Sequence, residues 1–219
     1  MKKYNFNEKE LLSLFIAGDN ELREVLKKPY TNNGFVFASD SHIMIRINPE
    51  ILQGKYPECP KLRLDFPKND LSVKISLKAI KEVLSELPKT DIEFVGDDIF
   101  CDECDADGNV YWEYQDSNGK LHEKSFACPI CDGSGYIERK REIHTGNFVP
   151  YLNLVIGIGD VSYKACYVDI VCRAMEMLGV DEITLLHQGE YEIMLLQVDE
   201  NIHIGVMPNL SEPDYELKL

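Results

Sequence analysis

The chain has 219 residues, with 38 acidic and 23 basic side chains, which gives a formal net charge of −15. Hydrophobic residues make up 44% of the chain and charged residues 28%, as in ordinary folded proteins with a hydrophobic core. This composition excludes a disordered tail and a collagen-like chain. The acidic balance also argues against binding of nucleic acid through bulk charge. The length suits one large domain or two small ones.

The expected elements of the first half are, in chain order, a helix at 7–17, strands at 35–40 and 42–47, a connector at 54–70, a strand at 71–75 and a helix at 77–87. Asn7 and Glu10 form a capping box for the first helix. Asp40 and Ser41 favour a tight turn between the paired strands. Ser76 can cap the second helix. The segment 21–28 has helical propensity, but its short length and the proline after it leave it ambiguous.

The expected elements of the second half are strands at 91–95, 110–114, 121–126, 136–144 and 151–159, a helix at 164–178, and strands at 182–186, 191–198 and 202–207. Strands and helices do not alternate regularly, so a doubly wound nucleotide-binding fold is disfavoured. The order predicts an α+β protein with mostly antiparallel sheets and a few packed helices.

No part of the sequence is typical of a membrane anchor or a signal peptide. Residues 1–6 carry two lysines, but no apolar segment follows them. No run approaches the roughly 18 apolar residues of a membrane-spanning helix. We therefore expect a cytoplasmic protein with no membrane partner, in which thiols stay reduced.

Four of the seven cysteines form two C-x-x-C pairs, Cys101 with Cys104 and Cys128 with Cys131. Two such turns supply the four thiolates of a tetrahedral zinc site. The intervening segment predicts a hairpin around an Asn-Gly turn, which would return the second pair to the first. We expect one structural Zn²⁺, and a catalytic zinc is disfavoured because four thiolates leave no coordination position open.

Other interpretations of the cysteine pairs stay open from the sequence alone. A redox dithiol, an iron–sulfur site and unpaired surface thiols each fit some of the pattern. His122 or His144 could replace a thiolate, although an exposed histidine is more often only part of the polar surface.

The residues after each pair resemble the cysteine-rich zinc module of DnaJ-type chaperones. Residues 128–135 fit C-x-x-C-x-G-x-G in full, and residues 101–108 fit it except for Ala106 at the first glycine. In that family each motif supplies two thiolates to a shared zinc, and the glycines permit the tight knuckle turn. The resemblance implies an inserted, zinc-ribbon-like module at 97–135, with two motifs where the chaperones carry four.

The charge of this module argues for contact with protein or for a purely structural role. Residues 97–135 contain ten acidic residues and two lysines, a net charge of −8 before the thiolates are counted. Nucleic-acid-binding zinc ribbons usually have the opposite sign. Tyr111, Trp112 and Tyr114 could stack on bases or pack on a partner, and they could also simply fill one face of a hairpin.

The segments on either side of the module resemble the bacterial DNA polymerase sliding clamp, the β clamp. Residues 37–43, Phe-Ala-Ser-Asp-Ser-His-Ile, are similar to the family's Ala-Thr-Asp-Gly-His-Arg-Leu pattern. Residues 205–210, Gly-Val-Met-Pro-Asn-Leu, are similar to its final Val-Met-Pro-Met-Arg-Leu strand. The resemblance implies a clamp-like body at 1–96 and 136–219.

The same resemblance implies assembly of copies into a ring around duplex DNA and a pocket near the last strand for peptides of replication proteins. Met207, Pro208 and Leu210 would lie near that pocket, and a buried terminal strand is the alternative interpretation. Two features depart from the family. About 180 residues remain outside the module, fewer than two clamp domains need, and the predicted helices carry a summed charge of −1 rather than a basic lining.

The sequence predicts a non-enzymatic, clamp-like accessory protein of DNA replication or repair. Protein partners are expected, whereas duplex DNA has little support from the charge. The alternative is a zinc-stapled protein-interaction module with no role on DNA. An enzyme is disfavoured, because there is no nucleophile motif or phosphate loop, and paired carboxylates such as Asp97 and Asp98 are usually only solvated.

Overall fold

The computed structural model describes residues 5–18, 21–59, 67, 70–96 and 98–219. The chain divides into two compact units, residues 1–88 with 150–219 (unit 1) and residues 89–149 (unit 2). Most of the expected connector at 54–70, the first four residues and Asp97 lie outside the described residues. In the described part, no helix has the length and apolar character needed to cross a membrane.

Unit 1 contains a seven-stranded sheet in which every neighbouring pair is antiparallel. Its strands, in spatial order, are β1 (Tyr30–Asn32), β2 (Phe35–Ser39), β3 (Ile43–Ile47), β15 (Ile202–Val206), β14 (Glu192–Asp199), β13 (Glu182–Gly189) and β4 (Val73–Ser76). Strands from the beginning and the end of the chain meet at its centre, where Ile45 lies opposite Ile204. This long-range pairing closes unit 1 into one body.

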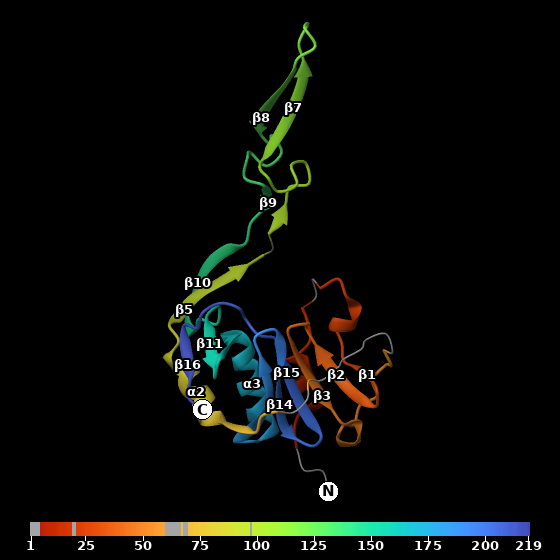
Figure 1. Ribbon diagram of the computed structural model, residues 1–219, viewed down its shortest axis with the longest axis vertical. Helices are drawn as coiled ribbons and strands as arrows, with labels where there is room; N and C mark the ends of the chain where they lie inside the picture. Colours follow the sequence, from red (N-terminus) through yellow and green to blue (C-terminus); the bar gives the residue numbers. More distant parts are fainter. Residues whose placement is uncertain (1–4, 19–20, 60–66, 68–69, 97) are drawn as a thin grey trace. The chain divides into compact units, whose positions relative to one another are not determined.

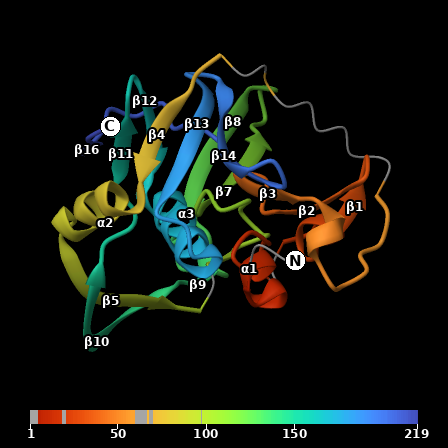
Figure 2. The same cartoon turned by 90° about the horizontal axis from the view of Figure 1, so that it is seen from below.

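A second sheet of unit 1 has three strands, β12 (Val161–Lys164), β11 (Val155–Ile158) and β16 (Tyr215–Leu217). β11 is antiparallel to β12 and parallel to β16. Figure 2 shows α2 (Leu77–Glu86) and α3 (Ala165–Leu178) beside one another, with α2 next to β4. Unit 1 also holds α1 (Glu8–Ser13) and the short 3₁₀ turns η1 (Glu24–Leu26) and η2 (Pro49–Ile51).

The core of unit 1 follows from the apolar periodicity of these elements. Val168, Val171 and Met175 of α3 recur on one helical face and are buried with Ile80 of α2. The neighbouring strands β3 and β15 of the seven-stranded sheet contribute further buried side chains to the same cluster. Each fully buried aliphatic side chain contributes about 1.5–3 kcal/mol. The predicted α+β class with mainly antiparallel sheets is confirmed.

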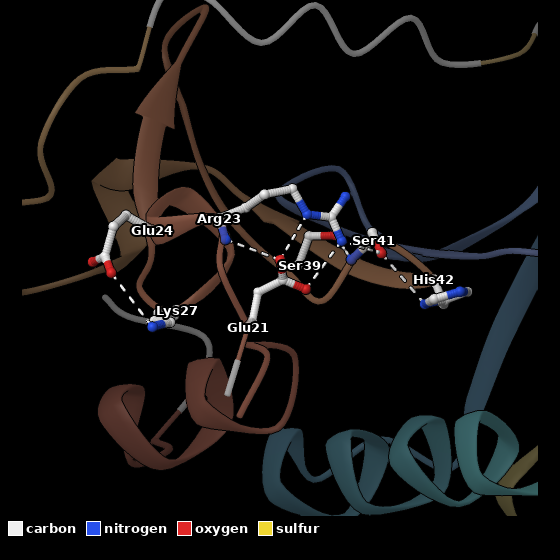
Figure 3. A network of polar contacts seen from close by, with 7 residues as sticks. All are labelled: Glu21, Arg23, Glu24, Lys27, Ser39, Ser41 and His42. Carbon is white, nitrogen blue, oxygen red and sulfur yellow. Dashed lines mark hydrogen bonds and ion pairs between the residues drawn. The ribbon is translucent and has the colours of Figure 1, made fainter. Parts of the chain in front are cut away.

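The predicted turn between β2 and β3 forms at Asp40 and Ser41, and its polar contacts are shown in part in Figure 3. The Asp40 carboxylate accepts hydrogen bonds from the backbone N–H groups of His42 and Ile43, both at 2.8 Å. Ser41 has a φ of 84°, and its backbone N–H donates to the Ser39 hydroxyl. The tight connection fixes the register of the two strands.

An ion pair next to this turn connects a preceding loop to it. The Arg23 guanidinium contacts the Glu21 carboxylate at 2.8 Å and donates to the Ser41 hydroxyl at 3.4 Å (Figure 3). Hydrogen bonds from Arg23 lower the pKa of Glu21 to about 2. Because the Arg23 side chain is exposed and the Glu21 side chain is only half-buried, the pair positions the loop but contributes little stability.

Several predicted boundaries were wrong. The first helix ends at Ser13, before the expected residue 17. The expected strand at 136–144 is two strands, and the expected strand at 151–159 covers only Val155–Ile158. Four short strands, β1, β6 (Ile99–Phe100), β12 and β16, were not expected. Each has only two to four residues, too few for an alternating pattern to stand out. β1 and β12 pair with the strand next to them in the chain, whereas β6 and β16 pair with more distant strands.

Unit 2 consists of three nested two-stranded ribbons. They are β5 (Lys89–Val95) with β10 (Arg141–Pro150), β6 (Ile99–Phe100) with β9 (Tyr136–Glu138), and β7 (Asn109–Gln115) with β8 (Leu121–Ala127). The nesting is that of one long hairpin, which the two cysteine knuckles interrupt before β7 and after β8. Unit 2 contains the expected 97–135 module and extends past it at both ends, because β5 pairs with β10.

His203 of β15 predicts a pH dependence of the stability of unit 1. The side chain is buried opposite Arg46, and its Nδ1 has no hydrogen-bond partner among the described residues. Burial, followed by the charge of Arg46, lowers the pKa of His203 to about 4. His203 therefore binds a proton more tightly in the unfolded chain than in the folded one. Its full contribution to the unfolding free energy is present above its pKa in the unfolded chain, and this contribution is lost as the pH falls toward its pKa in the folded protein.

We expect up to about 3 kcal/mol of unfolding free energy to be lost between about pH 7 and about pH 4 through this group. Urea unfolding of the wild type and of His203→Gln at both pH values measures it. The variant should lose less stability than the wild type over this range. Equal losses would show that His203 does not carry the dependence.

Candidate metal centre

The four paired cysteines converge in unit 2. The side chains of Cys101, Cys104, Cys128 and Cys131 are buried, and their four Sγ atoms all lie within 4.8 Å of one another. The Sγ atoms of Cys101 and Cys128 are 3.8 Å apart, and those of Cys104 and Cys131 are 3.7 Å apart. A tetrahedron with metal–sulfur bonds of about 2.3 Å has edges of about 3.8 Å. The sulfur positions therefore fit a zinc-sized ion.

Two knuckles with the same backbone geometry bring the sulfurs together. In the first, the N–H of Gly108 donates to Cys104 Sγ, and in the second the N–H of Gly135 donates to Cys131 Sγ, both at 3.3 Å. The knuckles also bond to each other, since the N–H of Cys101 donates to the Gly135 carbonyl and the N–H of Cys128 to the Gly108 carbonyl. This reciprocal pairing places one C-x-x-C turn opposite the other.

The knuckle turns require left-handed backbone. Gly108 and Gly135 have φ values of 80° and 77°, and a Cβ at either would lie within 2.4 Å of a carbonyl oxygen of the other knuckle. Ala106 has a φ of 65°, where Gly133 of the second knuckle has 77°. A non-glycine residue in this region is strained by about 1 kcal/mol. The departure of residue 106 from the glycine pattern is therefore tolerated with strain and does not break the knuckle.

The thiols hold their protons unequally. Burial raises the pKa of Cys101, and it raises the pKa of Cys104 to about 12. Burial acts in the same direction on Cys131, but the Gly135 N–H and the neighbouring thiols outweigh it and lower its pKa to about 7. Four thiolates at these distances repel one another strongly, so a cation is needed for all of them to ionise together.

Neither histidine considered as a replacement ligand belongs to this cluster. His122 contacts Asp116 at 3.1 Å, and His144 contacts Asp91 at 3.0 Å. The remaining cysteines, Cys59, Cys166 and Cys172, are outside unit 2. Within the described residues, the four cysteines are the only group whose ligand atoms could hold a metal ion together.

The residues expected near a partner pocket have different surroundings. Met207 and Leu210 are exposed, and the Met207 N–H donates to the His42 carbonyl. Leu210 lines a hollow of about 590 Å³ with Ser162, Gln188 and Pro213. Met207 and Pro208 do not line this hollow. No local pattern indicated Ser162 and Gln188, because they belong to separate strands, β12 and β13, that only the folded chain brings together.

Sequence reasoning also missed a histidine held between two carboxylates. In β13, His187 is buried, its Nδ1 lies 2.9 Å from Asp70 Oδ1, and its Nε2 lies 2.6 Å from Glu192 Oε2. Irregular strand register on both sides of His187 aims the ring at these partners. Asp70 is distant in sequence, so no local motif indicated this contact.

No protein-family model matches this chain, and no curated protein matches it. Similar solved structures include the β sliding clamp of Caulobacter crescentus, with 12% identity and a TM-score of 0.41, covering 92% of this chain and 64% of that one. The DNA polymerase III subunit beta of Pseudomonas aeruginosa has 10% identity and a TM-score of 0.41, covering 92% and 63%. The chain thus spans less than two thirds of the length of these clamps.

Two glycine–alanine exchanges test the knuckle geometry. Ala106→Gly should relieve the left-handed strain and tighten zinc binding about two- to fivefold, which corresponds to about 0.5–1 kcal/mol. Gly135→Ala should weaken binding by more than tenfold, because the added Cβ meets the Ala106 carbonyl.

Gly119→Ala is the matched control for these exchanges. Gly119 has a φ of 80°, but a Cβ there meets only a side chain at 3.7 Å. Competition with a zinc chelator measures all three affinities. Equal effects of Gly135→Ala and Gly119→Ala would contradict the assigned contact between the knuckles.

Zinc affinity should rise with pH. Because the pKa values of Cys101 and Cys104 are raised, both thiols must release a proton when the metal binds. Each released proton changes the affinity about tenfold per pH unit, so log K should rise by about two or more per unit. Chelator competition across neutral pH, corrected for the chelator's own titration, gives this slope. A slope near zero would contradict a site made of thiols.

Proposed function

We propose that Cys101, Cys104, Cys128 and Cys131 hold one structural Zn²⁺. The distances between the sulfur atoms match the edges of a tetrahedron around zinc, and the two knuckles hold each other through reciprocal backbone hydrogen bonds. Both observations support this assignment. Four thiolates would fill the coordination shell, so the ion would staple unit 2 and would supply no position for a substrate. A redox pair is less well supported, because the four sulfurs are grouped symmetrically rather than as one dithiol.

We further propose that the protein is a non-enzymatic, clamp-like accessory protein of DNA replication or repair that acts by binding protein partners. The hollow beside Leu210 is the observation that supports this role best. Asn209 and Leu210, the last two residues of the segment that resembles the end of the β clamp, line it, and the lining combines apolar and hydrogen-bonding groups. Such a lining suits a short peptide from a partner.

Direct contact with duplex DNA has little support from the helices. Each cation within α2 and α3 has a carboxylate nearby, Lys78 with Glu82 at 3.6 Å, Lys81 with Glu176 at 2.5 Å and Arg173 with Asp169 at 4.0 Å. A DNA-facing surface uses unneutralised lysine and arginine to displace counterions from phosphates. We therefore assign protein partners, rather than the duplex, as the main ligands.

Site-specific photocrosslinking tests the proposed partner site. A photoreactive phenylalanine at Leu210 should capture subunits of the DNA replication machinery in cells. The same group at Leu22, which is 93% exposed and does not line the hollow, is the control. Capture of the same proteins at both positions, or of no replication protein at Leu210, would contradict the proposed role.

The alternative, a zinc-stapled interaction module without a role on DNA, gives a different result in the same experiment. Its crosslinks would come from unit 2 and would disappear in Cys128→Ser combined with Cys131→Ser. Crosslinks at Leu210 should survive that double variant, because the hollow is lined by residues of unit 1 only.

A further inference from the structure

The β7–β8 hairpin of unit 2 has two chemically different faces. Paired residues share a face in an antiparallel ribbon, and the register places Val110 opposite Phe126, Trp112 opposite Lys124, and Tyr114 opposite His122. These six residues form what we call the aromatic face. The opposite face, the acidic face, carries Tyr111 opposite Ser125 and Glu113 opposite Glu123. The two strands lie side by side in Figure 1.

The aromatic face is ordered but exposed. Trp112 is 67% exposed, Tyr114 58% and Phe126 46%. The Tyr114 ring stacks on the His122 ring at 5.0 Å with an interplanar angle of 12°, and Trp112 meets Phe126 edge-on at 6.3 Å. Solvent therefore contacts a row of rings whose orientations are already fixed by their neighbours. Such preorganised rings lose little conformational entropy when a flat ligand stacks on them.

The charges of the hairpin strands are sorted between these faces. Lys124 is the one permanently charged side chain on the aromatic face, and its Nζ lies 5.0 Å from the centre of the Phe126 ring. Both strand carboxylates, Glu113 and Glu123, are on the acidic face. The Asp116 carboxylate at the turn is engaged by His122 and by two backbone N–H groups. The net charge of the module, which is a sum over both faces, does not reveal this separation.

We propose that the aromatic face binds single-stranded nucleic acid by stacking unpaired bases on Trp112 and Tyr114, with Lys124 beside the phosphates. Exposed aromatic rings combined with a cation are the elements of sequence-tolerant single-strand binding. Residues two apart on a strand are separated by about 6.7 Å, which lets neighbouring rings take separate bases of an extended strand. This inference does not depend on the proposed clamp role.

Local charge favours this ligand over a basic peptide. A lysine- or arginine-rich segment on the aromatic face would meet Lys124, whereas a phosphate would be attracted to it. The exposed carboxylates of the knuckles, Asp102, Glu103 and Asp107 among them, repel phosphates at the other end of the hairpin. We therefore place the bound strand over Trp112 and Tyr114, in the middle of the hairpin, where Lys124 lies opposite Trp112.

Trp112 is the only tryptophan of the chain, so its fluorescence reports directly on this face. Titration of the full-length, zinc-loaded protein with short oligothymidylate at low salt should quench the emission in a saturable way. Because few phosphates are neutralised, log K should fall with log salt by only about 0.7–1.4. Oligouridylate and oligodeoxyuridylate, which differ only in the 2′-hydroxyl group, show in parallel titrations whether the sugar matters. A duplex of the same length should not compete, since its bases are already stacked.

Variants of the two faces separate stacking from unspecific attraction. Tyr114→Ala should weaken binding of labelled oligothymidylate about tenfold, as loss of one stacked base does. Lys124→Gln should weaken it and flatten the salt dependence. Tyr111→Ala, on the acidic face, is the matched control and should leave the affinity unchanged. Metal content and thermal unfolding of each variant show that the hairpin is intact.

Three results would overturn the proposal. The first is no quenching by oligothymidylate at low salt. The second is an equal loss of affinity in Tyr111→Ala and Tyr114→Ala. The third is tighter binding and stronger quenching by oligolysine, which would assign the face to a basic polypeptide instead.

Discussion

The convergence of four buried thiols is the constraint on which unit 2 depends. Among the described residues of this unit, Val110 is the one hydrophobic side chain other than the cysteines that packs into the buried cluster, and most side chains of the ribbons are exposed. An isolated two-stranded hairpin is marginally stable in water at best. A metal bound by four thiolates can supply the missing folding free energy, as it does in other small domains without a sufficient core.

Unit 1 is stabilised in a different way. Its helices and two sheets share one apolar cluster, and the pairing of β3 with β15 joins residues that are more than 150 positions apart in the chain. Burial of apolar surface, rather than a bound ion, holds this body together. Removal of metal is therefore expected to act on unit 2 while the core of unit 1 stays intact.

The cysteine cluster could be predicted from the sequence because its determinants are local. The C-x-x-C spacing, the following glycines and the Asn-Gly turn each act over a few residues. The pairing of β3 with β15 and of β11 with β16 could not be predicted from the sequence, because the register between distant segments depends on the assembled core. The hollow at Leu210 and the contacts of His187 could not be predicted from the sequence for the same reason.

The hairpin shows a second limit of sequence reasoning. Its net charge correctly describes the module as acidic, but a sum over residues cannot distinguish two faces. Strict alternation along β7 and β8 separates Trp112 and Tyr114 from Glu113, and this separation becomes visible only once the register is known. In a two-stranded ribbon, the charge and the aromatic content therefore have to be assessed separately for each face.

X-ray absorption at the zinc edge of the purified full-length protein tests the central claim most directly. The knuckle geometry predicts one zinc per chain with four sulfur neighbours at about 2.3 Å and no nitrogen or oxygen ligand. A first shell with fewer than four sulfurs, or protein purified under reducing, metal-replete conditions that contains no zinc, would contradict it.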